Sequence, residues 1–436
     1  MGGTRTETTT PALDVHRARI LVIGVSALAL VAKTVLAALE RGPADVRIFD
    51  GFATTISQVG PVRIYEQPMP GLPVYNHPPL TGWMLSGFHE LENLGIPFGS
   101  LIRAPACLAD LVSAVLVFEI LRRRRPLRTA TVCAIGCALS PVLFATSGYH
   151  GNTDSVAIMF AVLAAWLLTD RRAPLAAGIA AALAVSVKLV PIVAVPALIV
   201  AAARAGRPVA ARLCAGLVAV LLLLWGPALA TVPVALREKV LEYEGGRARL
   251  WGLVRFADWA GASESFVAAL HSDFHFVFVL LCTAAGAWLA WARPTAPAYA
   301  VALSLTLLLL LSTGSAVQYL AWPVVGLCLF GLWEGLAYGV VVGAVTVVVY
   351  TGAGAVRWND WALHLAEAGW LLVAAGTVTG LRRVLAEPPL PPPGEPVPVV
   401  AQRNGEPSPP SHSSSPPHPS TDRRDDPHRR QVEKPQ

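Results

Sequence analysis

Charged residues are scarce in this 436-residue chain, at only 14%, whereas a soluble domain carries about 25%. Hydrophobic residues make up 54%, and the mean hydropathy is +0.55. The apolar residues fall in runs of roughly 20, the length that crosses a bilayer. Backbone polar groups in lipid have to be satisfied within their own segment, so the runs predict helices. The composition excludes a soluble enzyme and predicts an all-α, polytopic membrane bundle of about 11–12 transmembrane helices.

Three kinds of functional signal are also missing. The chain has no Gly-rich phosphate loop and no nucleotide-binding fold between its apolar runs, which argues against direct use of ATP or a nucleotide sugar. All six cysteines fall inside apolar runs, where they are expected to pack as small apolar side chains. The net charge of +6 comes with arginines placed at helix ends, as membrane topology requires, and does not indicate a nucleic-acid partner.

The apolar runs predict twelve spans. They cover residues 18–39, 101–121, 129–146, 155–169, 209–230, 274–292, 298–311, 320–336, 338–351 and 361–381, and the run 173–203 is divided into two short helices at Lys188. The positive-inside rule places the arginine pairs and both termini in the cytoplasm of a plasma-membrane protein. The segments 1–17 and 384–436 are polar and are predicted to be disordered, on either side of a membrane domain of residues 18–383.

This topology places the polar segments 40–99 and 231–273 on the extracytoplasmic side, together with the turns at 147–154, 188–191 and 312–319. Within the first segment, residues 50–59 and 80–93 are each expected to form a short interfacial helix. Polar chemistry on one side only suggests an active site at the outer leaflet.

Asp50 lies soon after the first span, in the first outer segment. A carboxylate near the membrane edge is costly unless it is solvated or paired, and such residues are often functional. Asp50 is therefore a candidate general base, which would take a proton from an attacking hydroxyl. The alternative is a helix cap for residues 51–59, because Asp is a favoured N-cap.

The segment Tyr75-Asn76-His77-Pro78-Pro79-Leu80 is more specific. Its two prolines fix the backbone and would present Asn76 and His77 rigidly to a phosphate or a sugar hydroxyl. The alternative is a turn that begins the following helix, with proline in its first position.

A second polar turn, residues 148–154, reads GYHGNTD and contains His150, Asn152 and Asp154. These side chains are candidate substrate ligands. Asn152 could equally cap the next span, and the helix dipole favours Asp154 at a helix start.

Four further side chains are candidates for donor binding. Lys188 interrupts an apolar run, so it has to snorkel, pair or bind an anion such as a phosphate. Arg255 is the second candidate for the phosphate. Gln318 and Tyr319 lie at the mouth of a span, where aromatic residues are also common interfacial anchors.

The spacing of His271, Asp273 and His275 would suit a metal. Two of them flank the start of a span, where polar residues are expected without a metal, so no metal ligand is assigned.

At these residues the chain resembles bacterial GT-C glycosyltransferases, multispan enzymes that use polyprenyl-phosphate sugars. The resemblance rests on Asp50, on the segment 76–80, on the turn 148–154, on Lys188-Leu189-Val190-Pro191 and on the GVQYLxWP-like segment 316–323. The first two also resemble the eukaryotic glucosyltransferases that extend dolichol-linked oligosaccharide, in which a tyrosine stands where this chain has His77.

The resemblance implies an inverting transfer, with Asp50 as the base and the polyprenyl phosphate as the leaving group. Cations such as Lys188 would stabilise the charge of that phosphate. Many GT-C enzymes have paired acidic residues in the first loop; here the nearest pair is Asp45 and Asp50, so no cofactor is assigned and a divalent metal stays open.

The sequence therefore predicts a hexosyltransferase that moves mannose or glucose from a polyprenyl-phosphate carrier to a lipid-linked or envelope glycan or glycolipid, in contact with membrane lipid. The alternative is a transporter or flippase of a lipid-linked saccharide. It is less favoured because the polar residues cluster at one membrane face and no internal repeat is evident. A third alternative is a non-catalytic subunit of glycan assembly.

Overall fold

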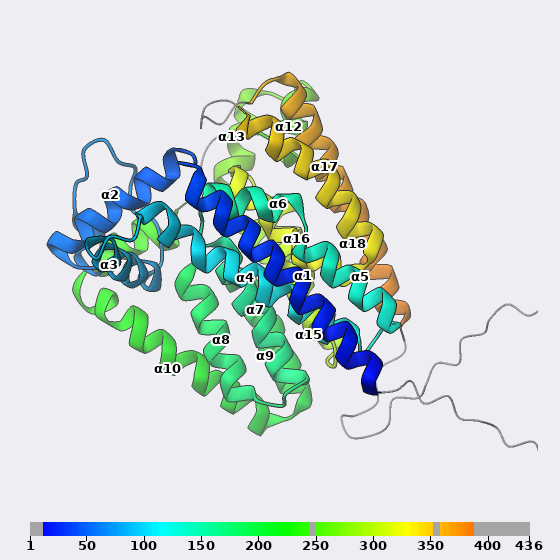
Figure 1. Ribbon diagram of the computed structural model, residues 1–436. Coiled ribbons are helices and arrows are strands. Elements are labelled where there is room, and N and C mark those ends of the chain that lie inside the picture. Colours follow the sequence, from blue (N-terminus) through cyan, green and yellow to red (C-terminus); the bar gives the residue numbers. More distant parts are fainter. Residues whose placement is uncertain (1–11, 244–248, 352–357, 388–436) are drawn as a thin grey trace, which may run out of the picture. The chain divides into compact units, whose positions relative to one another are not determined.

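The computed structural model describes residues 12–243, 249–351 and 358–387, and every regular element within them is a helix (Figure 1). Seven of these are long and apolar enough to cross a membrane. They are α1 (Ala12–Leu39), α4 (Phe98–Leu121), the run Leu127–His150, α10 (Arg207–Thr231), α14 (His275–Ala292), α17 (Leu332–Tyr350) and α18 (Asp360–Ala386). The predicted all-α, polytopic membrane bundle is confirmed.

Shorter apolar helices complete the bundle, which brings the described total to the predicted range. They are α7 (Asp154–Thr169), α8 (Pro174–Val187), the pair η3 (Val190–Ala194) and α9 (Val195–Ala205), α15 (Pro297–Leu311), and the pair η5 (Val317–Ala321) and α16 (Trp322–Phe330). The predicted division of the run 173–203 is confirmed, because α8 ends at Val187 and Lys188 has an extended backbone.

Small residues allow α8 and α10 to approach closely. A side chain at Gly178 would overlap the carbonyl oxygen of Leu213 on α10, and one at Gly216 would overlap that of Leu175 on α8. Such reciprocal small-residue contacts are typical of membrane helices, where packing rather than water exclusion drives association. They fix the helix whose end carries Lys188.

Two helices outside the long spans, α2 (Ala44–Val59) and α3 (Pro79–Asn93), lie side by side (Figure 1). They pack on a core that includes Phe52, Ile56, Tyr65 of η1 (Arg63–Glu66) and Tyr75. The predicted helices over 50–59 and 80–93 are therefore present, but α2 begins six residues earlier than expected.

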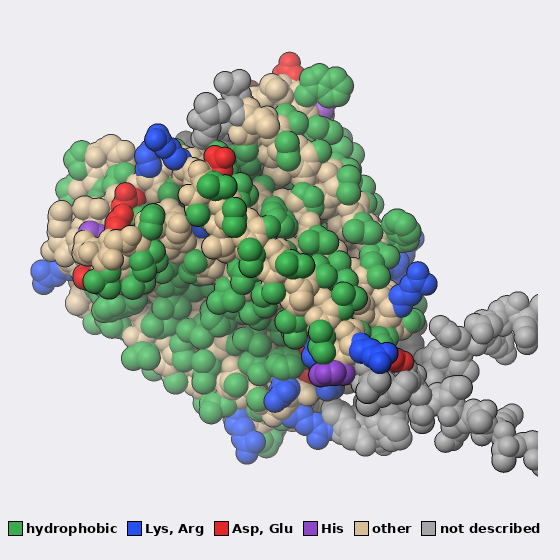
Figure 2. Space-filling model, viewed as in Figure 1, with side chains coloured by type: hydrophobic (Ala, Val, Ile, Leu, Met, Phe, Trp, Pro, Cys, Tyr) green, Lys and Arg blue, Asp and Glu red, His purple; other side chains and the backbone are tan. Residues whose placement is uncertain are grey.

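The second polar segment folds into short helices, namely α11 (Pro233–Leu236), η4 (Arg237–Leu241), α12 (Gly252–Trp259) and α13 (Glu264–Ser272). Figure 2 shows hydrophobic side chains over the flank of the bundle and Lys and Arg side chains near the start of α1 and the turn between α9 and α10. Residues 12–17, predicted to be disordered, belong to α1; residues 1–11 and 388–436 lie outside the described residues.

Candidate functional site

Two segments far apart in the sequence meet through an Asp–His contact. Asp45 lies in the first turn of α2, and its Oδ2 is 2.8 Å from Nε2 of His150. On the other side of the same imidazole, Nδ1 is 2.6 Å from the hydroxyl of Tyr350. A carboxylate can only accept, so Nε2 carries the proton, and in the neutral ring Nδ1 accepts from Tyr350. The imidazole of His150 is thereby fixed in orientation.

A π-helix, η2 (Phe144–His150), and the tight turn after it position His150. Gly151 adopts φ +74°, and a side chain there would meet Cγ of the buried Arg103 at 2.8 Å, so only glycine fits. Asn152 Oδ1 then accepts from the backbone N–H of Asp154 at 3.1 Å. The N-cap residue of α7 is Thr153, whose side chain makes no capping bond, so Asn152 contacts the start of the helix without being its cap.

The start of α7 and the end of α8 meet through an ion pair. Asp154 is 1% exposed, and its Oδ2 lies 3.4 Å from Nζ of Lys188. Its Oδ1 accepts a 2.7 Å hydrogen bond from Nε1 of Trp322 at the start of α16. The break after α8 thus turns Lys188 toward the polar turn 148–154.

Lys188 also lines a cavity of about 350 Å³. Leu, Val, Ile and Phe side chains form much of its wall, and the polar groups that line it include Asn76, Lys188, Tyr243, His275 and Tyr319. The Tyr319 ring stacks on Trp322 with 4.2 Å between centroids. A mostly apolar cavity with a few convergent polar groups is the usual form of a small-molecule site.

Electrostatics keep Asp45 ionised. Burial acts to raise the pKa of its carboxyl, but the hydrogen bond from His150 and the charge of Lys188 lower the pKa overall. The side chain remains 37% exposed. Asp45 is therefore an accessible carboxylate beside a cation and a fixed imidazole, which is what a general base requires.

His77 occupies a different environment from the one predicted. Its ring lies among Phe49, Phe52 and Tyr75, and the nearest of these, Phe49, has its centroid 4.9 Å away. Burial, with a contribution from the charge of Lys188, holds the pKa of His77 well below its usual range, so the ring is neutral at pH 7. Of the Asn76–His77 pair, only Asn76 lines the cavity.

Asp50 lies in the interior of α2, so it cannot be the cap of a helix that begins at residue 51; that alternative was wrong. Five residues separate Asp50 from Asp45, which places them about 140° apart around a helix. Asp45 lies nearer the buried face defined by Phe49, Phe52 and Ile56. The carboxylate that contacts the polar turn is therefore Asp45.

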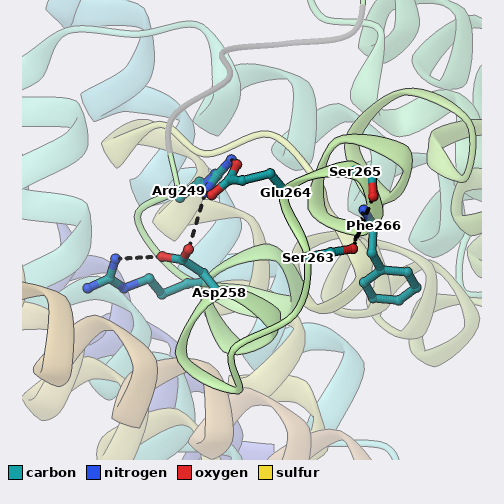
Figure 3. A network of polar contacts seen from close by, with 7 residues as sticks. Arg249, Asp258, Ser263, Glu264, Ser265 and Phe266 are labelled. Carbon is teal, nitrogen blue, oxygen red and sulfur yellow. Dashed lines mark hydrogen bonds and ion pairs between the residues drawn. The ribbon is translucent and has the colours of Figure 1, made fainter.

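Arg255 and Gln318 are not among the described residues that line the cavity. Arg255 Nη1 lies 3.3 Å from Oδ2 of Asp258, and its guanidinium lies 5.0 Å from the centroid of the Trp259 ring. Asp258 also pairs with Arg249, in a network that includes Glu264 (Figure 3).

The three candidate metal ligands do not converge. His271 and His275 both contact Thr313, through its carbonyl oxygen at 2.9 Å and its hydroxyl at 3.3 Å respectively. In the described part of the chain, no group of three His, Cys, Asp or Glu side chains is placed to hold a metal ion.

Sequence reasoning missed Asp45 and Tyr350. Asp45 had a local signal, since Pro43 before it and an acidic residue in the first turn are typical of a helix start. Tyr350 had none, because its contact with His150 joins residues 200 positions apart.

Residues 76–230 match the model of a family described as dolichyl-phosphate-mannose-protein mannosyltransferase. The match begins at Asn76 and includes the turn 148–154 and Lys188. No curated protein gives a significant match to the chain.

Two solved structures show a similar course of the chain. ArnT from Cupriavidus metallidurans, bound to undecaprenyl phosphate, is 15% identical with a TM-score of 0.45, over 84% of this chain and 77% of that one. The Archaeoglobus fulgidus oligosaccharyltransferase, tethered with an acceptor peptide, is 13% identical with a TM-score of 0.38, over 84% of this chain and 56% of that one. At these TM-scores neither likeness bears on the site.

Proposed function

We propose that this membrane protein is a glycosyltransferase that transfers mannose or glucose, with inversion, from a polyprenyl-phosphate donor to a glycan or glycolipid acceptor. The match of residues 76–230 to the dolichyl-phosphate-mannose-protein mannosyltransferase family supports this proposal. One observation carries the proposal: an ionised carboxylate, Asp45, is held by His150 within electrostatic range of Lys188, the cation of a largely apolar cavity whose lining does not include Asp45 itself.

The cavity suits the carrier end of the donor. Its apolar wall would take the first prenyl units, and Lys188 would take the phosphate. Among the described residues, the ion pair of Lys188 is the 3.4 Å contact with Asp154, which is long enough to leave its ammonium available to a stronger anionic partner. Asn76 and Tyr319 line the same cavity and would donate hydrogen bonds to phosphate or sugar oxygens.

Asp45 is the proposed general base. It takes the proton of the acceptor hydroxyl while that oxygen bonds to the anomeric carbon of the donor. The bond from the anomeric carbon to the phosphate oxygen breaks, and the polyprenyl phosphate leaves with the electron pair. Lys188 stabilises the charge that develops on the leaving oxygen, an effect that is strong in a site with little water. His150 orients Asp45 throughout.

We place this chemistry on the extracytoplasmic side. Arginines follow the ends of α4 and α7 and close α9. The site residues lie at the other ends of the helices that carry them: His150, Asp154 and Lys188. The positive-inside rule assigns such arginines to the cytoplasm. Both termini then lie in the cytoplasm, as the sequence predicts.

The test is a transfer assay with purified protein in detergent, radiolabelled polyprenyl-phosphate mannose or glucose, and a lipid extract as acceptor. Wild type is compared with Asp45→Asn and with Asp50→Asn, two substitutions of the same size on the same helix. We expect transfer by the wild type and by Asp50→Asn and its loss in Asp45→Asn. Loss in Asp50→Asn alone would return the base to the residue predicted from sequence, and a wild type inactive with both donors would contradict the proposed reaction.

A further inference from the structure

Two charged side chains that the proposed transfer does not use lie buried between α1 and α4. Lys33 Nζ is 2.7 Å from Oδ2 of Asp110, and the two side chains are 1% and 4% exposed. A buried ion pair is costly to desolvate and is by itself weak evidence for stability. Ionisable residues inside a membrane domain are instead usually connected to function. The side chains around Lys33 and Asp110 belong to the segment that carries His150 and Asp154.

Two serine side chains lie next to the Asp110 carboxylate. Ser147 and Ser155 are the neighbours of this carboxylate in the segment 147–155, and their own Oγ atoms lie 2.9 Å apart, within hydrogen-bond distance of each other. Both serines are buried. Ser147 lies in the last turn before His150, and Ser155 directly follows Asp154. The hydrogen bond between the two hydroxyls therefore joins the two ends of the segment 147–155, which contains His150 and Asp154.

Lys33 contacts the same segment from the other side. Its ammonium lies 5.0 Å from the centroid of Phe144, the first residue of the π-helix. A side chain at Gly148 would meet Cα of Lys33 at 3.4 Å, so α1 and the π-helix are in direct contact. π-Helical turns are rare and are often found at functional sites.

We propose that Lys33 and Asp110 are positioning residues, which act through Ser147 and Ser155 to hold His150 against Asp45 and Asp154 against Lys188. Lys33 supplies the opposite charge that a buried carboxylate such as Asp110 requires. Neither residue lines the substrate cavity. The catalytic part of this inference rests on the proposed function; the structural part does not.

The same two helices provide a matched control. Arg19 of α1 and Glu119 of α4 form another ion pair, at 2.6 Å, near the opposite ends of these helices, where Glu119 also pairs with Arg122 of the same helix end at 2.7 Å. Glu119→Gln weakens a link between α1 and α4 without touching the segment 147–155. Asp110→Asn weakens a link between the same helices that does touch it. A pair that only joined α1 to α4 would give the two variants the same behaviour.

We expect Asp110→Asn to lower kcat by about 10- to 100-fold, because a small displacement of groups near the reaction is costly, with little change in the KM for polyprenyl-phosphate sugar. Glu119→Gln should behave as the wild type.

The acid limb of the pH–rate profile should also move to higher pH in Asp110→Asn. Asp45 faces His150, Lys188, His77, Tyr319 and Tyr350, and displacement of His150 removes a group that lowers its pKa. An unchanged kcat and profile in a folded Asp110→Asn, or an equal loss in Glu119→Gln, would overturn the inference.

If Asp110→Asn does not fold, Ser147→Ala with Ser155→Ala leaves the ion pair intact and should show the same loss of kcat and the same shift of the acid limb. A second readout is hydrogen–deuterium exchange of peptides from 144–155 in detergent, which needs no transfer activity. Exchange should rise in the serine variant and not in Glu119→Gln. Unchanged exchange in the serine variant would refute the positioning role proposed for Lys33 and Asp110. A wild type without transfer would count against the proposed function alone.

Discussion

Lys188 and Asp154 form an ion pair at 3.4 Å, and the remaining oxygen of Asp154 accepts a 2.7 Å hydrogen bond from Trp322. Trp322 stacks on Tyr319, so the carboxylate connects the polar turn 148–154 to the wall of the cavity. Asp154 therefore orients Lys188 without neutralising it in a short bond. This arrangement sets the direction in which the ammonium points when a phosphate binds.

Removal of that ammonium tests its role in catalysis. Lys188→Met should lower kcat by about 10²- to 10³-fold, the usual cost of losing one group that stabilises developing negative charge. It should also raise the KM for the donor. Lys188→Arg retains a cation and should recover part of both parameters. Steady-state transfer kinetics across a range of donor concentrations separate the two effects. Wild-type kinetics in Lys188→Met would assign the leaving phosphate to another group.

The pH dependence tests the pairing of Asp45 with His150. Asp45 takes a proton only when ionised, so activity is lost as the pH falls through its pKa. The contact with His150 and the charge of Lys188 lower that pKa, while burial acts to raise it. His150→Phe removes the largest lowering contribution and leaves the burial, so the acid limb should move to higher pH.

The measurement is kcat/KM for the donor against pH, in wild type and His150→Phe. Tyr350→Phe is the matched control, because it removes the hydroxyl on the far nitrogen of the same imidazole and leaves the contact with Asp45 in place. Its acid limb should stay close to that of the wild type. An acid limb that does not respond to His150→Phe would exclude Asp45 as the group that titrates.

The sequence predicted the membrane bundle and the break at Lys188, because both depend on local signals: runs of apolar residues, and a lysine and a proline within one of them. It placed the start of α2 at residue 50 rather than at Ala44, and so did not show that Asp45 lies in the first turn of the same helix. It also treated Asn76 and His77 alike. Adjacent residues in an extended segment point to opposite sides, and here one lines the cavity while the other is buried among aromatic rings.

Arg255 was the second candidate for the donor phosphate, and its contacts predict a different outcome. It pairs with Asp258 and packs on Trp259, outside the residues that line the cavity. Arg255→Met should therefore leave the KM for the donor close to that of the wild type, because its partners Asp258 and Trp259 also lie outside the cavity lining. Donor titrations compare it with Lys188→Met. A large rise in KM in Arg255→Met would bring α12 into the donor site.

The glycine contact between α8 and α10 predicts a loss of stability without a change in chemistry. A side chain at Gly178 would overlap the backbone of α10 at Leu213, and backbone yields less readily than a flexible side chain. Gly178→Val should destabilise the protein by about 1–3 kcal/mol, the usual cost of overpacking. Gly226 on α10 has open space around it, so Gly226→Ala is the control and should be neutral or slightly stabilising. Thermal unfolding in detergent measures both, and equal melting temperatures would show that the two helices can separate at no cost.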